Sequence, residues 1–178
     1  TAVLRKFPSL EISIPTRPFG NLPVYFSADS SLGGIARHDA AITTPFFVER
    51  FDLHPAVEIP LVRTNALDWS QRFSVRETTY TQSRQTNAVS DGLSRFSFDY
   101  TSNFAGPRIE RDFGTWKHVI EPSVEYRYLT GADRFRNTIV VDDVDLVTNT
   151  NQLEYALTNR FFTSREILSW RVAQTYFF

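Results

Sequence analysis

The sequence predicts an all-β fold of antiparallel, up-and-down strands that forms a segment of a large transmembrane β-barrel. Three observations predict it: apolar and polar residues alternate, several alternating stretches span 11 to 15 residues, and short and long connections roughly alternate. Strands of soluble domains usually have about 5 to 6 residues, whereas a tilted membrane strand needs about 9 to 11. Outer-membrane barrels also alternate short periplasmic turns with longer extracellular loops.

About eight strands are expected within one segment, residues 1–178. They are Phe7–Pro15, Pro23–Gly33, Phe46–Leu61, Leu67–Thr81, Leu93–Phe104, Thr115–Leu129, Asn151–Phe161 and Ile167–Phe178. The connections "TRPFGN", "VRTNA" and "FTSRE" are short, whereas "GIARHDAAITT", "QSRQTNAVSD" and "GADRFRNTIVVDDVDLVTNT" are longer. "AGPRIERDFG" should be a short turn and is not, so the alternation is imperfect.

The first three stretches each carry one apolar row. These rows are Leu10, Ile12 and Ile14; Val24, Phe26 and Ala28; and Phe47, Phe51, Leu53, Val57, Ile59 and Leu61. Glu49 interrupts the third row, and Pro55 and Pro60 lie inside that stretch. Because proline has no N–H to donate to the ladder, a bulge is expected beside each proline in a strand, including Pro122 in the sixth stretch.

The fourth stretch, "WSQRFSVRETTY", leaves two interpretations open. Trp69, Phe73 and Val75 lie on one face, while Arg72 and Arg76 lie on the other. In a soluble β-sandwich, the apolar face would meet a second sheet in a core. In a membrane barrel, the apolar face would contact lipid and the charged face would line an aqueous lumen. The length of the strands favours the barrel.

The remaining stretches continue the same two rows. Their apolar residues include Phe96 and Phe98 in the fifth, Val124 and Tyr126 in the sixth, Leu153 and Tyr155 in the seventh, and Trp170 and Tyr176 in the eighth. The residues expected to face the lumen are Arg72, Arg76, Arg95, Asp99, Glu121, Glu125, Arg127, Arg160 and Arg171. The residues expected to face lipid are Trp69, Phe73, Val75, Phe96, Phe98, Val124, Tyr126, Trp170 and Tyr176.

Composition narrows the range of functions. The net charge of −1 gives no field that would attract nucleic acid. The absence of cysteine excludes disulfides and thiolate metal sites within the sequence. Aromatic residues make up 15% of the chain, and such residues form the girdles of membrane barrels. With no methionine and an end inside an apparent strand, the sequence is expected to be a segment of a longer chain.

The sequence offers little for catalysis or for a cofactor. It contains neither a GxSxG nucleophile elbow nor a P-loop, so no enzyme activity and no cofactor are expected. His38, His54 and His118 lack zinc-site spacing, and each is expected to be solvated or luminal. The loop sequence "VVDDVDL" carries three aspartates that could bind calcium, but the twelve-residue loop pattern with its central glycine is missing. A solvated loop without a specific metal site is expected instead.

An ordered set of motifs carries a family resemblance. "RFDLHPAVEIPL", "SVRETTY", "KHVIEPSVEYRYLTG", "DDVDLVTNTNQLEYALTNRFF" and "ILSWRVAQTYFF" follow one another in this order. Together they resemble the C-terminal barrel of the LptD (OstA) family of outer-membrane lipopolysaccharide-assembly proteins. These motifs cover about residues 50–178.

The resemblance implies a function and partners. The family's barrel has about 26 strands, within the range known for such barrels, and this chain would supply about eight of them. The implied role is part of a lipopolysaccharide translocon in the cell outer membrane, with passage through the lumen and a lateral opening. The implied partners are lipopolysaccharide, outer-membrane lipid, an LptE-like plug lipoprotein and a periplasmic bridge protein. A different outer-membrane barrel, such as a porin or receptor, and a soluble β-sandwich binding module are the alternatives.

Overall fold

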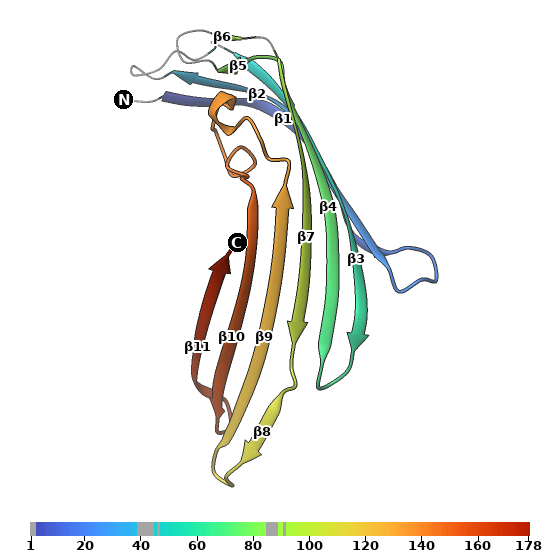
Figure 1. Cartoon of the computed structure of the whole chain (residues 1–178), viewed down its shortest axis with the longest axis vertical. Coiled ribbons are helices and arrows are strands. Elements are labelled where there is room, and N and C mark those ends of the chain that lie inside the picture. Colours follow the sequence, from blue (N-terminus) through green and yellow to red (C-terminus); the bar gives the residue numbers. More distant parts are fainter. Residues whose placement is uncertain (1–2, 39–44, 46, 85–88, 91) are drawn as a thin grey trace. The chain divides into compact units, whose positions relative to one another are not determined.

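The fold is a single antiparallel sheet. The computed structural model describes residues 3–38, 45, 47–84, 89–90 and 92–178. Nine strands of the described residues form one sheet in the order β1-β2-β3-β4-β7-β9-β10-β11, with β8 paired to β9 (Figure 1). The strands are β1 Val3–Pro18, β2 Tyr25–His38, β3 Val48–Arg63, β4 Asp68–Tyr80, β7 Leu93–Ala105, β8 Ile109–Asp112, β9 Lys117–Thr130, β10 Thr150–Phe162 and β11 Glu166–Phe177. The all-β, up-and-down prediction is confirmed. The sheet is open at β1 and β11, so closure into a barrel stays a prediction.

The eight expected strands all form, with lengths of 12 to 16 residues. The expected start at Phe46 lies outside the described residues, as do residues 39–44, 85–88 and 91 of two expected connections. Short pieces that the sequence did not predict are the hairpin of β5 (Ser83–Arg84) with β6 (Val89–Ser90) and a 3-10 turn, η1 (Phe135–Asn137). Within the described ranges, no helix is long and apolar enough to cross a membrane.

Prolines inside β1 coincide with irregular pairing. The register between β1 and β2 shifts between Lys6 and Ser9, around Pro8, and again between Ile14 and Arg17, around Pro15. A proline cannot donate its share of the ladder hydrogen bonds, so the pairing steps past it. The strand tolerates the prolines through these shifts, and β1 extends beyond the stretch expected from its apolar row.

The irregular connection between the fifth and sixth expected strands has a structural explanation. β7 ends at Ala105, and the chain resumes pairing with β9 as β8, which begins at Ile109. The turn itself comprises only residues 113–116, closed by a 2.9 Å hydrogen bond from Phe113 N to Trp116 O. The connection is therefore a short turn after an interrupted strand, and the expectation that "AGPRIERDFG" breaks the alternation is wrong.

Glycine is required at position 106, where the strand is interrupted. Gly106 has φ +109°, and a Cβ atom there would lie 2.2 Å from the carbonyl oxygen of Ala66. Its N–H donates to the carbonyl oxygen of Pro122 at 2.8 Å. The interruption in one strand thus lies beside the proline of its neighbour.

Gly106→Ala is expected to lower the free energy of unfolding by at least about 2 kcal/mol, because it adds a backbone clash to a strained φ. The control is Gly114→Ala. Gly114 also has positive φ, but its Cβ would meet nothing within 4 Å, so only the conformational strain remains. Urea unfolding of the full-length protein in detergent measures both variants. An equal decrease in the free energy of unfolding in the two variants would show that the clash with the carbonyl oxygen of Ala66 is not important.

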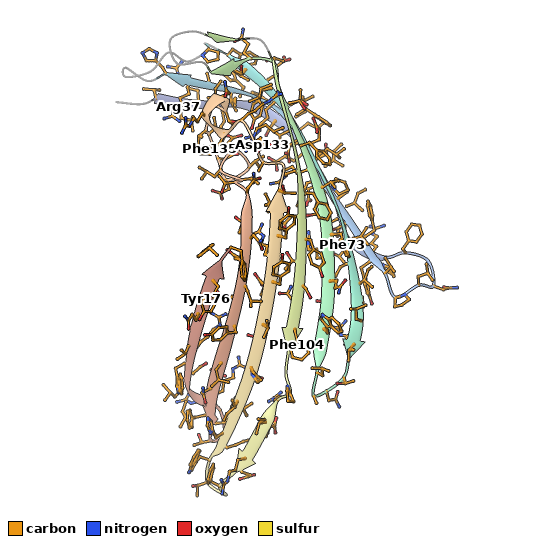
Figure 2. The ribbon with its side chains drawn as sticks, in the orientation of Figure 1. Arg37, Phe73, Phe104, Asp133, Phe135 and Tyr176 are labelled. Carbon is orange, nitrogen blue, oxygen red and sulfur yellow. The ribbon has the colours of Figure 1, made fainter. Side chains whose placement is uncertain are left out.

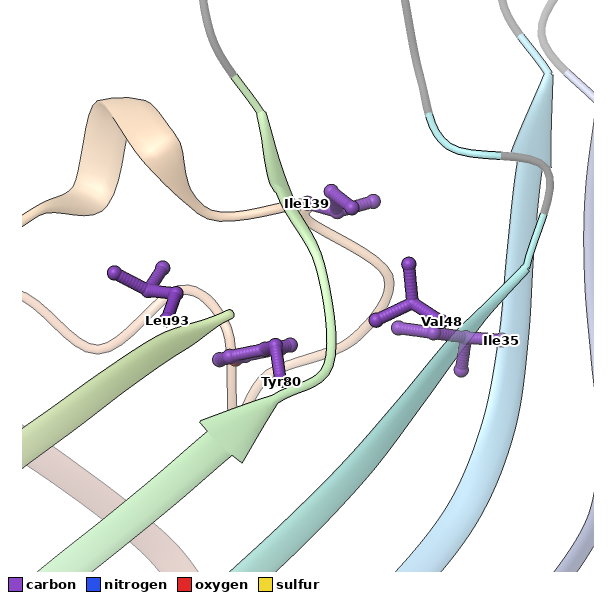
Figure 3. Close-up of a cluster of buried hydrophobic side chains, with 5 residues drawn as sticks. All are labelled: Ile35, Val48, Tyr80, Leu93 and Ile139. Atoms are coloured by element: carbon purple, nitrogen blue, oxygen red, sulfur yellow. The ribbon is translucent and has the colours of Figure 1, made fainter. Parts of the chain in front are cut away.

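The described residues divide into two compact units. Unit 1 comprises residues 1–57, 73–99 and 129–149, and unit 2 comprises residues 58–72, 100–128 and 150–178. Unit 1 contains a cluster of buried apolar side chains, shown in Figure 3: Ile35, Val48, Tyr80, Leu93 and Ile139. Ile139 comes from the connection between β9 and β10, so this connection packs on the strands.

Large apolar side chains are exposed along the strands of both units. Side chains project from both faces of the strands (Figure 2). Leu10, Leu61, Phe96 and Val172 are each 46% exposed or more. The second sheet that a β-sandwich would lay over these residues is not present among the described ones, where the only other sheet is the β5–β6 hairpin.

Candidate functional site

The charged face of unit 1 is covered by the connection between β9 and β10, which we call the long loop (residues 131–149). Val48, Asp52 and Ala56 alternate along β3 and are buried, whereas Phe51 and Leu53 between them are exposed. The face with the polar residues is therefore the covered one, and the apolar face is open. This is the reverse of the arrangement in a soluble domain, in which the apolar row is buried.

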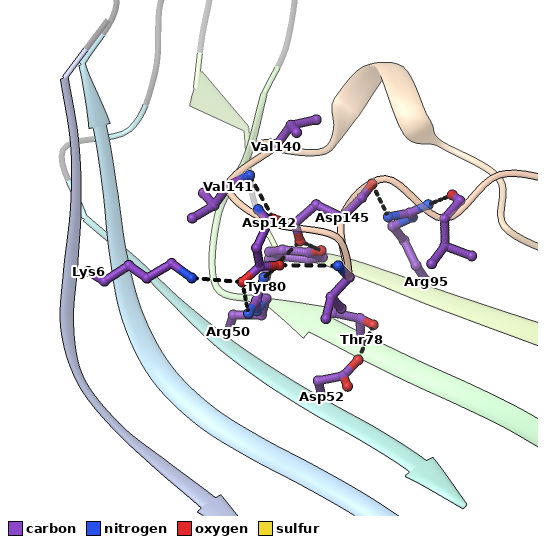
Figure 4. Close-up of polar contacts among 12 residues, drawn as sticks. Lys6, Arg50, Asp52, Thr78, Tyr80, Arg95, Val140, Val141, Asp142 and Asp145 are labelled. Atoms are coloured by element: carbon purple, nitrogen blue, oxygen red, sulfur yellow. Dashed lines mark hydrogen bonds and ion pairs between the residues drawn. The ribbon is translucent and has the colours of Figure 1, made fainter. Parts of the chain in front are cut away.

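Arg50 on β3 holds the long loop through two aspartates (Figure 4). Its Nη1 and Nη2 donate to the two carboxylate oxygens of Asp142 at 2.7 and 2.8 Å, and Nη1 also donates to Asp145 at 3.0 Å. Lys6 Nζ on β1 donates to Asp142 at 3.2 Å. The hydrogen bond from Arg50 is the main reason why the pKa of the Asp142 carboxyl is lowered to about 2, so this group is ionised at physiological pH.

Asp145 is the most deeply buried of these groups, with a side chain that is 0% exposed. Its Oδ1 accepts a 2.5 Å hydrogen bond from the hydroxyl of Tyr80 as well as the bond from Arg50. Its Oδ2 accepts the backbone N–H groups of Val141 at 2.8 Å and Asp142 at 3.2 Å. One carboxylate thus gathers four donors from two strands and its own loop.

Arg95 fixes the other side of the long loop. This side chain is 7% exposed and donates to three loop carbonyl oxygens, those of Asp133 at 3.2 Å, Asp145 at 3.2 Å and Val147 at 2.7 Å. Arg37 on β2 donates to the carbonyl oxygen of Val140 at 2.8 Å. The donors of Arg95, which was expected to face the lumen, bind the carbonyl oxygens of the long loop.

The aspartate-rich sequence differs from the solvated loop that was expected. Asp145 is buried and Asp142 is largely covered, whereas only Asp143 is exposed as expected. The expectation of a solvated loop is wrong because Arg50 and Lys6 neutralise these carboxylates. Both cations come from distant parts of the sequence. Among the described residues, no group of three or more acidic or histidine side chains is arranged to hold a metal ion.

A second polar group in unit 1 lies further along β3 and β4. Asp52 accepts a 2.6 Å hydrogen bond from the hydroxyl of Thr78, and its other carboxylate oxygen lies 3.5 Å from Nε of Arg76. Arg76 also has Nη2 3.3 Å from Nδ1 of His54. The expected luminal residue Arg76 is therefore part of a half-buried polar network that includes His54.

Unit 2 carries a ladder of alternating charges. Its members, in order, are Lys117, Glu110, Arg108, Glu121, Arg160 and Glu166. Nε of Arg108 lies 2.8 Å from Glu110 and 3.6 Å from Glu121, and Glu121 lies 3.7 Å from Nη1 of Arg160. These side chains are 32 to 43% exposed, so water screens the pairs and each is individually weak.

An open groove adjoins the charge ladder in unit 2. Its volume is about 430 Å³, and its lining includes Arg108, Glu121, Ser123 and Thr158 together with the β3–β4 turn at residues 64–67. The lining combines both signs of charge with apolar residues such as Leu67, Ala105 and Pro122, so the groove is of mixed polarity.

The other expected luminal residues have varied surroundings. Arg72, Asp99 and Arg127 are half-buried, and Asp99 and Arg127 have interaction partners. Glu125 is exposed, and Arg171 on β11 forms an ion pair with Glu154 on β10. The structure joins Glu121 to Arg160 but does not gather all nine expected residues into one site.

The expected lipid-facing residues range from half-buried to exposed. Phe96, Val124, Trp170 and Tyr176 are 54%, 39%, 44% and 47% exposed. Half-buried members of the set are Trp69, Phe73, Val75, Phe98 and Tyr126. The indole N–H of Trp69 donates to the hydroxyl of Ser102 at 3.1 Å, which satisfies its polar atom beside an apolar row.

Aromatic side chains gather near the β8–β9 turn of unit 2. The rings of Phe113 and Trp116 stack with centroids 3.9 Å apart, and those of His118 and Phe161 stack at 4.3 Å. Nε2 of His118 also lies 2.9 Å from Oδ1 of Asn159. His118 is half-buried beside Phe161 and Asn159, and the expectation that it is solvated or luminal stays a prediction.

Sequence reasoning missed the residues that anchor the long loop: Lys6, Arg37, Arg50, Tyr80, Asp142 and Asp145. One feature of the sequence indicates that this loop is packed against other residues. The apolar run of Ile139, Val140 and Val141 is unusual for a solvated connection and indicates a loop that packs on something. The identity of its partners could not be read, because Arg50 and Asp142 are 92 residues apart.

The exposed apolar rows, the charged opposite face and the long up-and-down strands define a β-type membrane protein. No curated protein matches the chain in a sequence comparison. The family model described as LptD, LPS transport system D, matches residues 2–178. The chain therefore belongs to the LptD family of outer-membrane proteins and has a role in lipopolysaccharide transport.

Proposed function

We propose that this chain is part of the wall of a closed transmembrane β-barrel that delivers lipopolysaccharide to the outer leaflet of the outer membrane. The observation that carries this proposal is the exposure of the apolar rows opposite a face of charged, paired residues. Lipid covers the apolar rows, and water fills the space on the other side. The family membership supports the identity of the transported molecule.

The proposed face assignment follows the two rows of the strands. The residues that face the lumen in this proposal are Arg72, Arg76, Arg95, Asp99, Glu121, Glu125, Arg127, Arg160 and Arg171. The residues that face lipid are Trp69, Phe73, Val75, Phe96, Phe98, Val124, Tyr126, Trp170 and Tyr176. The aromatic cluster beside the β8–β9 turn supports a girdle at one rim of the membrane.

Transport requires no covalent step in this proposal. The sugar portion of lipopolysaccharide moves through the lumen, and its lipid portion leaves through a lateral opening of the barrel. The half-exposed ladder around Glu121 and Arg160 can exchange its internal ion pairs for brief contacts with phosphate or carboxylate groups. Such contacts must be weak to permit release. The proposed partners are an LptE-like plug lipoprotein and a periplasmic bridge protein that supplies the lipopolysaccharide.

Depletion of the full-length protein tests the transport function. We expect newly made lipopolysaccharide to stop reaching the cell surface, measured by its accessibility to an extracellular modifying enzyme after pulse labelling. A plasmid-borne copy should restore export. The competing function is a diffusion porin or receptor. Normal lipopolysaccharide export in depleted cells, together with open-channel conductance of the purified protein, would establish that function instead.

A further inference from the structure

The two aspartates that bind Arg50 differ in their access to solvent. Asp145 has a side chain that is 0% exposed and is held by four donors. Asp142 is 25% exposed, and the side chain of its partner Lys6 is 58% exposed. The loop therefore has one buried anchor and one carboxylate that solvent can reach.

Asp142 occupies a place that is built for an anion. The fork of Arg50 meets both of its oxygens, and the ammonium group of Lys6 meets one of them. This is the arrangement with which an arginine binds a phosphate group, because the two anions share the same bidentate geometry. A small cavity of about 70 Å³ adjoins the carboxylate, and its lining includes the cations Lys6 and Arg50, the polar residues Ser9 and Ser31, and one further acidic residue, Glu11. A second anion can therefore approach from the side that the loop leaves open.

We propose that Lys6 and Arg50 form an anion-binding subsite in which the carboxylate of Asp142 is the resident occupant, displaced by a phosphate ester on a sugar. This inference rests on the proposed function, because the phosphate ester belongs to the transported glycolipid. Asp145 keeps the long loop attached while Asp142 leaves. The exchange thus opens a binding place without releasing the loop.

The expected affinities allow a phosphate ester to replace the carboxylate of Asp142 on Lys6 and Arg50. A tethered group competes at an effective concentration in the millimolar range, so free phosphate esters must reach millimolar concentrations to displace Asp142. A phosphate group confined in the lumen meets that requirement locally. Its charge of about −1.5 to −2 exceeds that of a carboxylate, which favours the phosphate on the two cations.

The test is a titration of the purified full-length protein with glucose 1-phosphate, followed by ³¹P NMR. Wild type should bind with a millimolar dissociation constant, and Asp142→Asn should bind at least about 10-fold more tightly because the competitor is weakened. The matched control is Asp143→Asn, which removes the same charge from an exposed neighbour and should resemble wild type. Lys6→Gln added to Asp142→Asn should reverse the gain.

Further measurements on the same protein identify the ligand and show whether the long loop stays attached. Glucose should not bind, and inorganic phosphate should bind more weakly than glucose 1-phosphate; equal binding of inorganic phosphate would overturn the assignment of a sugar ester. Tryptic cleavage at Arg134 and Arg136, which are exposed on the loop, should stay at the wild-type rate in Asp142→Asn. Faster cleavage would show that the loop is released and would overturn the proposal.

The outcome separates the subsite from the transport function. If Asp142→Asn and Asp143→Asn bind glucose 1-phosphate equally, the subsite is refuted, even when depletion still stops lipopolysaccharide export. If lipopolysaccharide export continues in depleted cells, lipopolysaccharide is not the source of the phosphate ester. The assignment of the ligand to the transported glycolipid then fails, whatever the titration shows.

Discussion

Asp145→Ala is expected to free the long loop from the strands beneath it. The substitution removes the acceptor for Arg50, for the hydroxyl of Tyr80 and for two backbone N–H groups. Removing one partner of a buried ion pair costs about 3 to 5 kcal/mol, because the remaining charge and donors stay buried without their acceptor. The loss should appear as local opening, since the sheet itself keeps its ladder of hydrogen bonds.

Limited proteolysis measures this opening in the full-length protein. Arg134 and Arg136 lie exposed in the loop, and trypsin cleaves them only when the segment opens. An opening that is about 3 kcal/mol easier should accelerate cleavage by at least about 100-fold. Asp143→Ala, two residues away on the exposed side of the same loop, is the control and should cleave like wild type. Similar rates in the two variants would mean that Asp145 does not anchor the loop.

Val124→Arg is expected to prevent normal assembly in the membrane. Val124 belongs to the apolar row of β9 and is 39% exposed. If that row faces lipid, an arginine near the middle of the bilayer costs about 2 to 4 kcal/mol. Such a loss is a large fraction of the stability of a folded protein. The folded fraction in outer-membrane preparations should therefore fall strongly.

The control for Val124→Arg introduces the same side chain at the next position. Glu125→Arg places it on the opposite face of β9, where water would solvate it, and assembly should be near normal. Heat-modified mobility on gels reports the folded fraction of both full-length variants. Equal assembly of the two variants, or a worse defect in Glu125→Arg, would contradict the face assignment.

The strands were predictable because a period of two is a local property. β4 and β10 begin and end within one or two residues of the stretches expected from their alternating rows. β8 was not predictable, since its four residues, Ile109–Asp112, include three charged ones and no recognisable row. Its partner, rather than its own pattern, makes it a strand.

The covered polar face could not be predicted from the sequence. Burial of Arg95 depends on three carbonyl oxygens from residues 133–147, which lie 38 to 52 positions away. Likewise, the aspartates of the long loop look solvated until Arg50 and Lys6 are brought to them. Alternation predicts which face of a strand a residue occupies, but it does not predict what covers that face.

The measurement that tests the central claim most directly is spin-label accessibility along β9 in the full-length protein in lipid bilayers. Single labels would replace Ile120, Val124 and Tyr126 in one row and Glu121, Ser123, Glu125 and Arg127 in the other. Labels in the first row should collide mainly with oxygen dissolved in lipid, and labels in the second mainly with a water-soluble nickel complex. A lack of alternation, or alternation with the opposite phase, would contradict a wall with lipid on its apolar face and water on its charged face.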